Sequence, residues 1–178
     1  DGESRSTLNI EKQLNSREKQ SYQGKHPTYK VPLIDRSLGG YGLEWREEIP
    51  VQVRAGELLA LREAGRHKWT IGVVRWAHQI KGATQLGIQL LAPHAVAVGM
   101  AVVHKTGGFA EYLRALYVPE LKAINQPASL ITNAISFHEY SKARLYFQQA
   151  VGTNSQGDQT VQSTNRLFGT SAFSQFGY

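Results

Sequence analysis

Cysteine is absent from this chain of 178 residues, which excludes disulfide bonds and thiolate chemistry and fits a reducing compartment. Long apolar runs are absent too, since none approaches the roughly 18 residues that suggest a membrane-spanning helix. The first five residues are polar and lack the apolar core of a signal peptide. We therefore expect a cytoplasmic protein with no membrane span. Because the chain has no initiator methionine, we also expect it to be a piece of a longer protein.

Motifs that would indicate an enzyme are missing as well. The six histidines show no metal-ligand spacing, and there is no H-E-x-x-H sequence. Neither a G-x-S-x-G nucleophile turn nor a G-x-x-x-x-G-K-S/T phosphate loop occurs. The 14 acidic residues are scattered, so there is no candidate pair of carboxylates for hydrolysis. The sequence therefore predicts no enzyme, no metal site and no cofactor.

The composition favours strands and turns, with seventeen Gly, eight Tyr and six Phe. The formal net charge is +6, and it is spread evenly along the chain. Residues 1–30 hold six Lys and Arg against four Asp and Glu, residues 31–93 hold eight against six, and residues 94–178 hold six against four, so each part carries +2. Nucleic-acid binders concentrate positive charge on one face. We therefore expect a mildly basic surface, with single-stranded nucleic acid binding as the least favoured alternative.

The pattern along the chain predicts an all-β fold in three parts. Residues 1–28 form a leader, in which Ser6 or Thr7 could cap a short helix through Gln20 and which is otherwise mobile. Residues 29–93 form a small antiparallel barrel and residues 94–178 a second β-rich unit. The segments that read as strands are Tyr29–Ile34, Tyr41–Trp45, Trp69–Trp76, Leu86–Ala92, Phe109–Val118, Ser129–Asn133, Ala143–Gln148 and Thr160–Phe168. Trp45 and Trp69 continue apolar faces, so we expect both in the core.

A polar turn lies between the first two strands of the expected barrel. Asp35 and Ser37 can bond their own backbone two residues on, while Gly39 and Gly40 can take positive φ without steric cost. The turn would then present a carboxylate, a hydroxyl and free backbone N–H groups. Such a group of donors and acceptors suits a polar or anionic ligand.

The sequence Asp35-x-Ser37-x-x-Gly40, followed by an alternating strand, resembles the D/N-x-S-x-x-G signature of PilZ domains, the bacterial receptors for cyclic di-GMP. The segments Trp69–Trp76 and Leu86–Leu91 resemble the paired late strands of that barrel, so the similarity covers roughly Tyr29 to Pro93. The resemblance implies a PilZ-like barrel and a signalling receptor that binds cyclic di-GMP. It implies a ligand site at Asp35, Arg36, Ser37, Gly39 and Gly40, completed by Arg17 on the leader.

One departure from the family pattern keeps a second interpretation open. PilZ domains carry an R-x-x-x-R pair upstream of the barrel, but Arg17 has Ser21 four residues after it and Gln13 four residues before it. The alternative is a PilZ-like module that no longer binds nucleotide and instead binds another protein. In either case we expect a protein partner of unknown identity.

Overall fold

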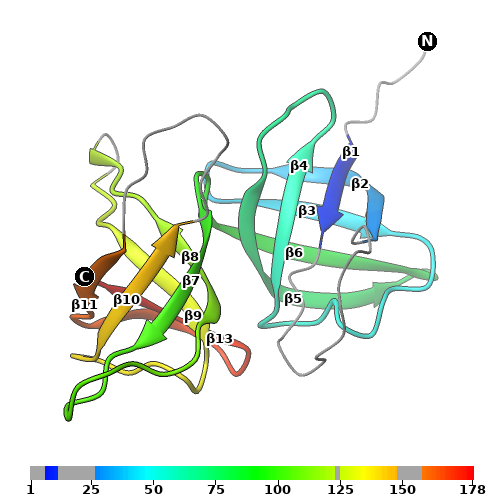
Figure 1. The fold of residues 1–178 in the computed structure, drawn as a ribbon. Helices are drawn as coiled ribbons and strands as arrows, with labels where there is room; N and C mark the ends of the chain where they lie inside the picture. The colour runs from blue at the N-terminus through cyan, green and yellow to red at the C-terminus, as the bar shows by residue number, and fades with distance from the viewer. Residues whose placement is uncertain (1–6, 12–26, 123–124, 148–157) are drawn as a thin grey trace. The chain divides into compact units, whose positions relative to one another are not determined.

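The computed structural model describes residues 7–11, 27–122, 125–147 and 158–178, and the elements formed by these residues are all β-strands (Figure 1). The chain divides into two compact units, Asp1–His94 and Ala95–Tyr178. The predicted all-β fold is confirmed. Each unit has its own hydrophobic core and is described by itself below.

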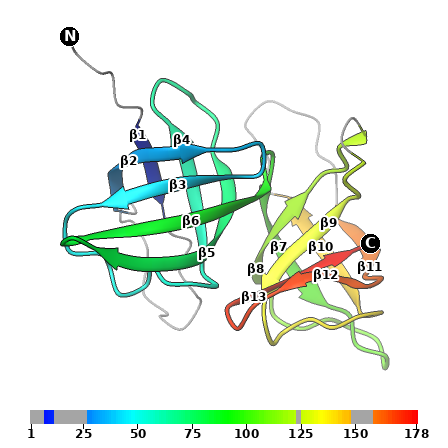
Figure 2. The ribbon, with the colours of Figure 1, turned by 180° about the vertical axis from the view of Figure 1, so that it is seen from behind.

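The first unit is a closed antiparallel barrel with the strand order β1-β2-β3-β6-β5-β4. Closure gives each strand a hydrogen-bonded neighbour on both sides, which is how small β folds limit edge-to-edge association. Figure 2 shows β2, β3, β6 and β5 side by side in that order. The strands are β1 (Thr7–Glu11), β2 (Thr28–Arg36), β3 (Gly40–Trp45), β4 (Leu58–Glu63), β5 (Thr70–Ile80) and β6 (Ala83–Ala92).

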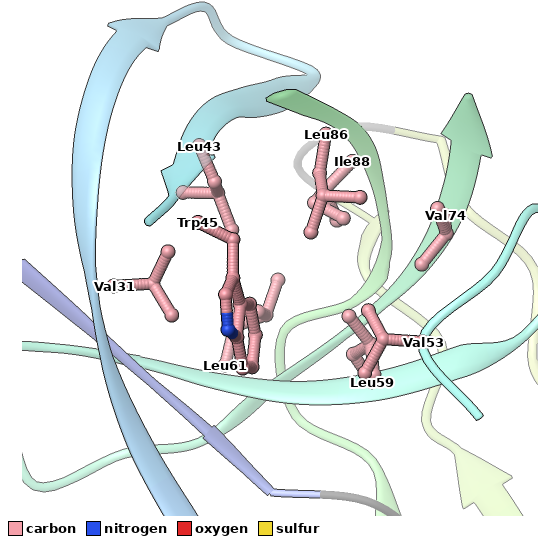
Figure 3. Packing of buried hydrophobic residues seen from close by; sticks show 9 residues of the cluster. All are labelled: Val31, Leu43, Trp45, Val53, Leu59, Leu61, Val74, Leu86 and Ile88. Carbon is pink, nitrogen blue, oxygen red and sulfur yellow. The ribbon is translucent and has the colours of Figure 1, made fainter. Parts of the chain in front are cut away.

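The barrel is filled by buried apolar side chains from five of its strands and the β3–β4 connection, which point toward one another in Figure 3. They are Val31, Leu43, Trp45, Val53, Leu59, Leu61, Val74, Leu86 and Ile88. Each side chain of this size contributes about 1.5–3 kcal/mol when fully buried. Trp45 is 3% exposed and packs its ring against Tyr29, with 5.1 Å between ring centroids. The expected core position of Trp45 is therefore confirmed.

Trp69 differs from this expectation, because it is only half-buried and lies outside the core cluster. It immediately precedes β5, and the guanidinium of Arg62 lies 4.7 Å from its ring centroid. A cation over an aromatic face is an attractive contact at a surface. The prediction that Trp69 is a core residue was wrong.

The leader also differs from the expectation. Thr7–Glu11 is not the start of a helix but strand β1, which pairs antiparallel with β2 on one side and with β4 on the other. Leu8 and Ile10 alternate with polar residues, and this period of two fits a strand better than the helix that we expected. The remainder of that expected helix, together with Arg17, lies outside the described residues.

The second unit is a seven-stranded antiparallel sheet with the order β11-β10-β7-β8-β9-β13-β12. The two edge strands are joined by only residues 163–165, and backbone bonds bridge that join: the N–H of Ser163 donates to the carbonyl of Ser141 (2.9 Å) and that of Thr164 to Gly177 (2.8 Å). The sheet therefore curls until its two ends are tied together. The strands are β7 (Val96–Val102), β8 (Leu113–Val118), β9 (Ser129–Asn133), β10 (Lys142–Phe147), β11 (Gln159–Gln162), β12 (Arg166–Gly169) and β13 (Phe173–Gly177).

Candidate functional site

The polar turn joins β2 to β3, as the sequence predicts, and its side chains are exposed. The backbone N–H of Arg36 donates to Oδ1 of Asp35 (2.8 Å), which fixes that carboxylate against its own turn. The N–H of Ser37 donates to the carbonyl of Gly40 (3.0 Å), and the Ser37 hydroxyl donates weakly to the same oxygen (3.4 Å). The second oxygen of Asp35 and the lone pairs of the Ser37 hydroxyl can still accept bonds from a ligand.

Gly40 is required by a close approach of two strands. A Cβ on this residue would collide with the carbonyl oxygen of Ile88 in the neighbouring strand β6. Gly39 has open space around its Cα, and its own carbonyl accepts a bond from the N–H of Leu90 (2.8 Å). Neither glycine adopts the positive φ that we expected. Glycine is thus required at position 40 because a side chain would collide with β6, and not because the backbone is left-handed there.

The turn forms one wall of a pocket of about 240 Å³. Asp35, Ser37, Gly39 and Gly40 line it from the turn, and Trp76 faces them from β5. The remaining lining residues are Tyr41, Gly42, Arg75, Gly87, Ile88 and Gln89. Four of the six predicted site residues therefore meet at a single pocket.

Trp76 is 40% exposed, an unusual position for so large an apolar side chain. The β5–β6 pairing shifts register between Val74 and Trp76, so the alternation that buries Val74 does not carry over to Trp76. Its indole lies over Gly87, at a place where a Cβ on that glycine would collide with the ring. The exposed face of such a ring suits stacking with a nucleobase. The sequence itself carries no sign of the register shift that exposes the ring.

Arg36 belongs to the turn in sequence but does not line the turn pocket. Its guanidinium lies 3.0 Å from Oε1 of Glu63 in β4, and the Tyr41 hydroxyl donates to the same oxygen (2.7 Å). Burial raises the pKa of Tyr41, and the carboxylate of Glu63 raises it further. Arg36 thus pairs with Glu63 of β4 and lies outside the pocket that the other turn residues line.

Two further features of the described residues bear on function. They contain no cluster of three or more His, Asp or Glu side chains that could hold a metal ion. They also contain no helix long and apolar enough to cross a membrane.

Arg75 and Gln89 line the turn pocket although no sequence motif marked them. The register of β5 and β6 brings them there, and a short motif carries no information on that register.

Comparison with known proteins matches both halves of the chain. Residues 1–97 match the family described as cyclic-di-GMP receptor FimW, middle PilZ domain, and residues 98–178 match the family described as FimW C-terminal beta-barrel domain. The chain is 39% identical over 155 residues to the cyclic-di-GMP receptor FimW of Pseudomonas aeruginosa. This alignment covers 86% of the chain and 24% of that relative, so the chain spans about a quarter of the length of the curated protein that it matches.

Proposed function

Because the chain belongs to the family of the cyclic-di-GMP receptor FimW, with its first 97 residues matching the middle PilZ domain, we propose that it is a cyclic di-GMP-binding receptor module of bacterial signalling. We place the nucleotide at the turn pocket. One observation carries this proposal: a carboxylate, a hydroxyl and an exposed indole converge on one pocket from β2, the β2–β3 turn and β5.

The pocket residues suit one guanine of the ligand. The N1–H and N2–H₂ edge of guanine consists of donors, and the carboxylate of Asp35 is an acceptor that can bond both. Trp76 lies in the same pocket and offers a π-face for the base. The pocket of about 240 Å³ has room for one base and not for the whole dinucleotide, so the rest of the ligand extends beyond it.

The phosphates and the second guanine require cations. Arg75 lines the pocket beside Trp76, and a guanidinium can bind phosphate or guanine O6 and N7 in bidentate fashion. Arg17 stays a prediction from the sequence, as the second cation that the leader supplies. Arg36 is not assigned to this role, because it does not line the turn pocket. In this proposal Arg75 and Arg17 replace the absent R-x-x-x-R pair.

Isothermal calorimetry of the 178-residue chain with cyclic di-GMP tests the proposal. We expect saturable binding at micromolar or lower concentration, weakened at least tenfold by Asp35→Ala and by Trp76→Ala, since a bond to a charged group and a base stack each contribute about 1–3 kcal/mol. Asp35→Asn keeps the bond to the Arg36 N–H and should retain part of the affinity. Glu111→Ala removes an exposed carboxylate of the second unit and serves as the matched control.

Absence of heat with the unaltered chain, or equal losses in Asp35→Ala and Glu111→Ala, would contradict the proposal. Melting temperatures of all variants show whether a loss of affinity reflects a loss of folding.

A protein partner is a second candidate function, supported by a specific surface of the second unit. Phe109, Tyr112 and Tyr146 are 43–53% exposed and touch one another, with centroids 5.7 Å apart for the first pair and 6.2 Å for the second. Exposed aromatic clusters are typical anchors of protein interfaces. A photo-crosslinker at position 146 should capture one defined protein in cells, and capture should be lost in Tyr112→Ser. Equal capture from a crosslinker at exposed position 171 would contradict this.

We propose the cytoplasm as the location. The lack of cysteine fits its reducing conditions, and the proposed ligand is an intracellular messenger.

Nucleic acid remains the least favoured ligand, and a gel shift with single-stranded oligonucleotides at low salt tests it. The proposed function predicts no shift.

A further inference from the structure

The barrel contains a second, larger hollow of about 530 Å³, which shares Tyr41 with the turn pocket and none of the turn pocket's other residues. The β4–β5 connection supplies one wall through residues 65–68, and Pro93 and His94 supply another. Leu61 and Thr70 also line the hollow. Its volume lies within the range of about 300–1,000 Å³ that is typical of small-molecule sites, whereas the turn pocket is smaller than that.

The lining of this hollow is strongly cationic. Among the described residues that line it, three side chains carry a fixed positive charge, namely Arg36, Arg66 and Lys68, and one carries a negative charge, Glu63. Three minus one leaves +2 with the two lining histidines neutral. Glu63 is already engaged by Arg36 and by the Tyr41 hydroxyl. Among the described residues, no carboxylate forms an ion pair with Arg66 or Lys68.

Within the described part of the chain, the lining cations that have no paired carboxylate therefore lie on the β4–β5 connection. Gly65, in this connection, has φ 77° and open space around its Cα, and the N–H of Arg66 donates to the carbonyl of Glu63 (3.0 Å). The tight turn that this bond closes places Arg66 and Lys68 at the rim of one hollow, two residues apart. A guanidinium can bind two phosphate oxygens at once, and an ammonium adds a compact positive charge.

We propose that this hollow binds a phosphorylated small molecule, with its phosphate held by Arg66 and Lys68 and its organic part against Leu61 and Pro93. The site is separate from the turn pocket and does not depend on the proposed binding of cyclic di-GMP. Among the described residues, Tyr41 is the one that lines both hollows, and its hydroxyl donates to Oε1 of Glu63, which lines the larger hollow.

Calorimetric titration of the 178-residue chain with pyrophosphate and with ribose 5-phosphate tests this proposal. Both probes lack a guanine and so cannot use the base contacts of the turn pocket. We expect saturable binding of one ligand per chain, weakened at least tenfold in the double variant Arg66→Ser, Lys68→Ser. Both residues lie on an exposed connection, so the variant should keep the melting temperature of the parent chain.

The matched control is Lys30→Ser, Lys81→Asn, which removes two positive charges of the same barrel outside the hollow. Lys81 has φ 49°, a conformation that asparagine tolerates. This control should bind both probes as the parent does, and so should Ser37→Ala in the turn pocket. The proposal is overturned by absence of binding at millimolar probe, or by equal weakening in the double variant and the control, which would indicate non-specific attraction to a basic surface.

Discussion

The indole of Trp76 occupies the space above Gly87 that a Cβ on that glycine would fill. Trp76 in β5 and Gly87 in β6 are paired directly, so the ring lies across strand β6. This contact places one side of the ring against β6. The ring of His78 lies 5.3 Å away between centroids, and the indole keeps 40% of its surface exposed.

Gly87→Ala should push the ring of Trp76 away from the strand. We expect a red shift of tryptophan fluorescence, because the indole gains contact with water, and a several-fold weaker affinity for cyclic di-GMP because the stacking face moves. The turn itself is unchanged by this substitution. Gly82→Asn, at a turn glycine with φ 81° and open space around it, is the control and should leave both readings as they are. Unchanged emission in Gly87→Ala would show that the ring is not held by this contact.

The two adjacent glycines of the turn should respond differently to alanine. Gly40→Ala drives a methyl group into the carbonyl of Ile88, and relieving that overlap by moving strands costs about 1–3 kcal/mol of unfolding free energy. Gly39→Ala meets open space and requires no unusual φ, so it should change stability by less than about 0.5 kcal/mol. Urea unfolding of the two variants measures the difference. Equal effects would mean that β3 and β6 are not packed so closely at this point.

The free energy of unfolding should fall at alkaline pH, because the pKa values of two tyrosine hydroxyls are higher in the folded chain than in the unfolded chain. Burial, with the Glu63 carboxylate as a further cause, raises the pKa of Tyr41, and burial together with a bond to Tyr117 raises the pKa of Tyr178. A raised pKa favours the folded state at pH values below the unfolded pKa of about 10, and that contribution is lost as the pH rises through the folded value.

Urea unfolding between pH 9 and 11 checks this expectation. Tyr41→Phe should flatten the decline in unfolding free energy, and so should Tyr178→Phe. Tyr140→Phe, at a position 72% exposed, is the control and should leave the slope as it is. A slope that none of the three substitutions alters would contradict the assignment.

The join between β11 and β12 depends on one buried hydroxyl. Ser163 is 1% exposed; its Oγ donates to the carbonyl of His138 (2.8 Å) and accepts from the N–H of Ser141 (3.0 Å). Ser163→Ala leaves both backbone groups without this partner and should cost about 1–3 kcal/mol. Ser171→Ala removes an exposed hydroxyl and should cost less than about 0.5 kcal/mol. Thermal unfolding of the two variants shows whether the hydrogen bonds of Ser163 stabilise the fold more than the exposed hydroxyl of Ser171 does. Similar melting temperatures would contradict this role of Ser163.

Local features of the fold could be predicted from the sequence because they depend on neighbours in the chain. The turn after Asp35 follows from acidic, hydroxyl and glycine residues within six positions, and the β5–β6 turn follows from Lys81 and Gly82. Both of these residues have positive φ, which is the geometry of a two-residue hairpin turn. Alternation likewise predicted the buried face of β3 that carries Leu43 and Trp45.

Features that depend on register could not be predicted in this way. The motif around Arg36 did not predict that the barrel brings Glu63 of another strand to 3.0 Å from its guanidinium. The roles of Trp69 and Trp76 depend on where β5 begins and where its pairing shifts register. A shift of one residue reverses the face of every later side chain, and alternation alone does not mark it.

The most direct test of the account is a cyclic di-GMP titration followed by NMR of the ¹⁵N-labelled tryptophan indoles. The chain has three tryptophans, which differ in environment: Trp45 is buried, Trp69 lies under Arg62, and Trp76 lines the turn pocket. We predict that the indole signal of Trp76 shifts saturably with nucleotide while those of Trp45 and Trp69 stay in place. A titration in which Trp76 does not move, or in which Trp69 moves in its place, would contradict binding at the Asp35–Gly40 turn.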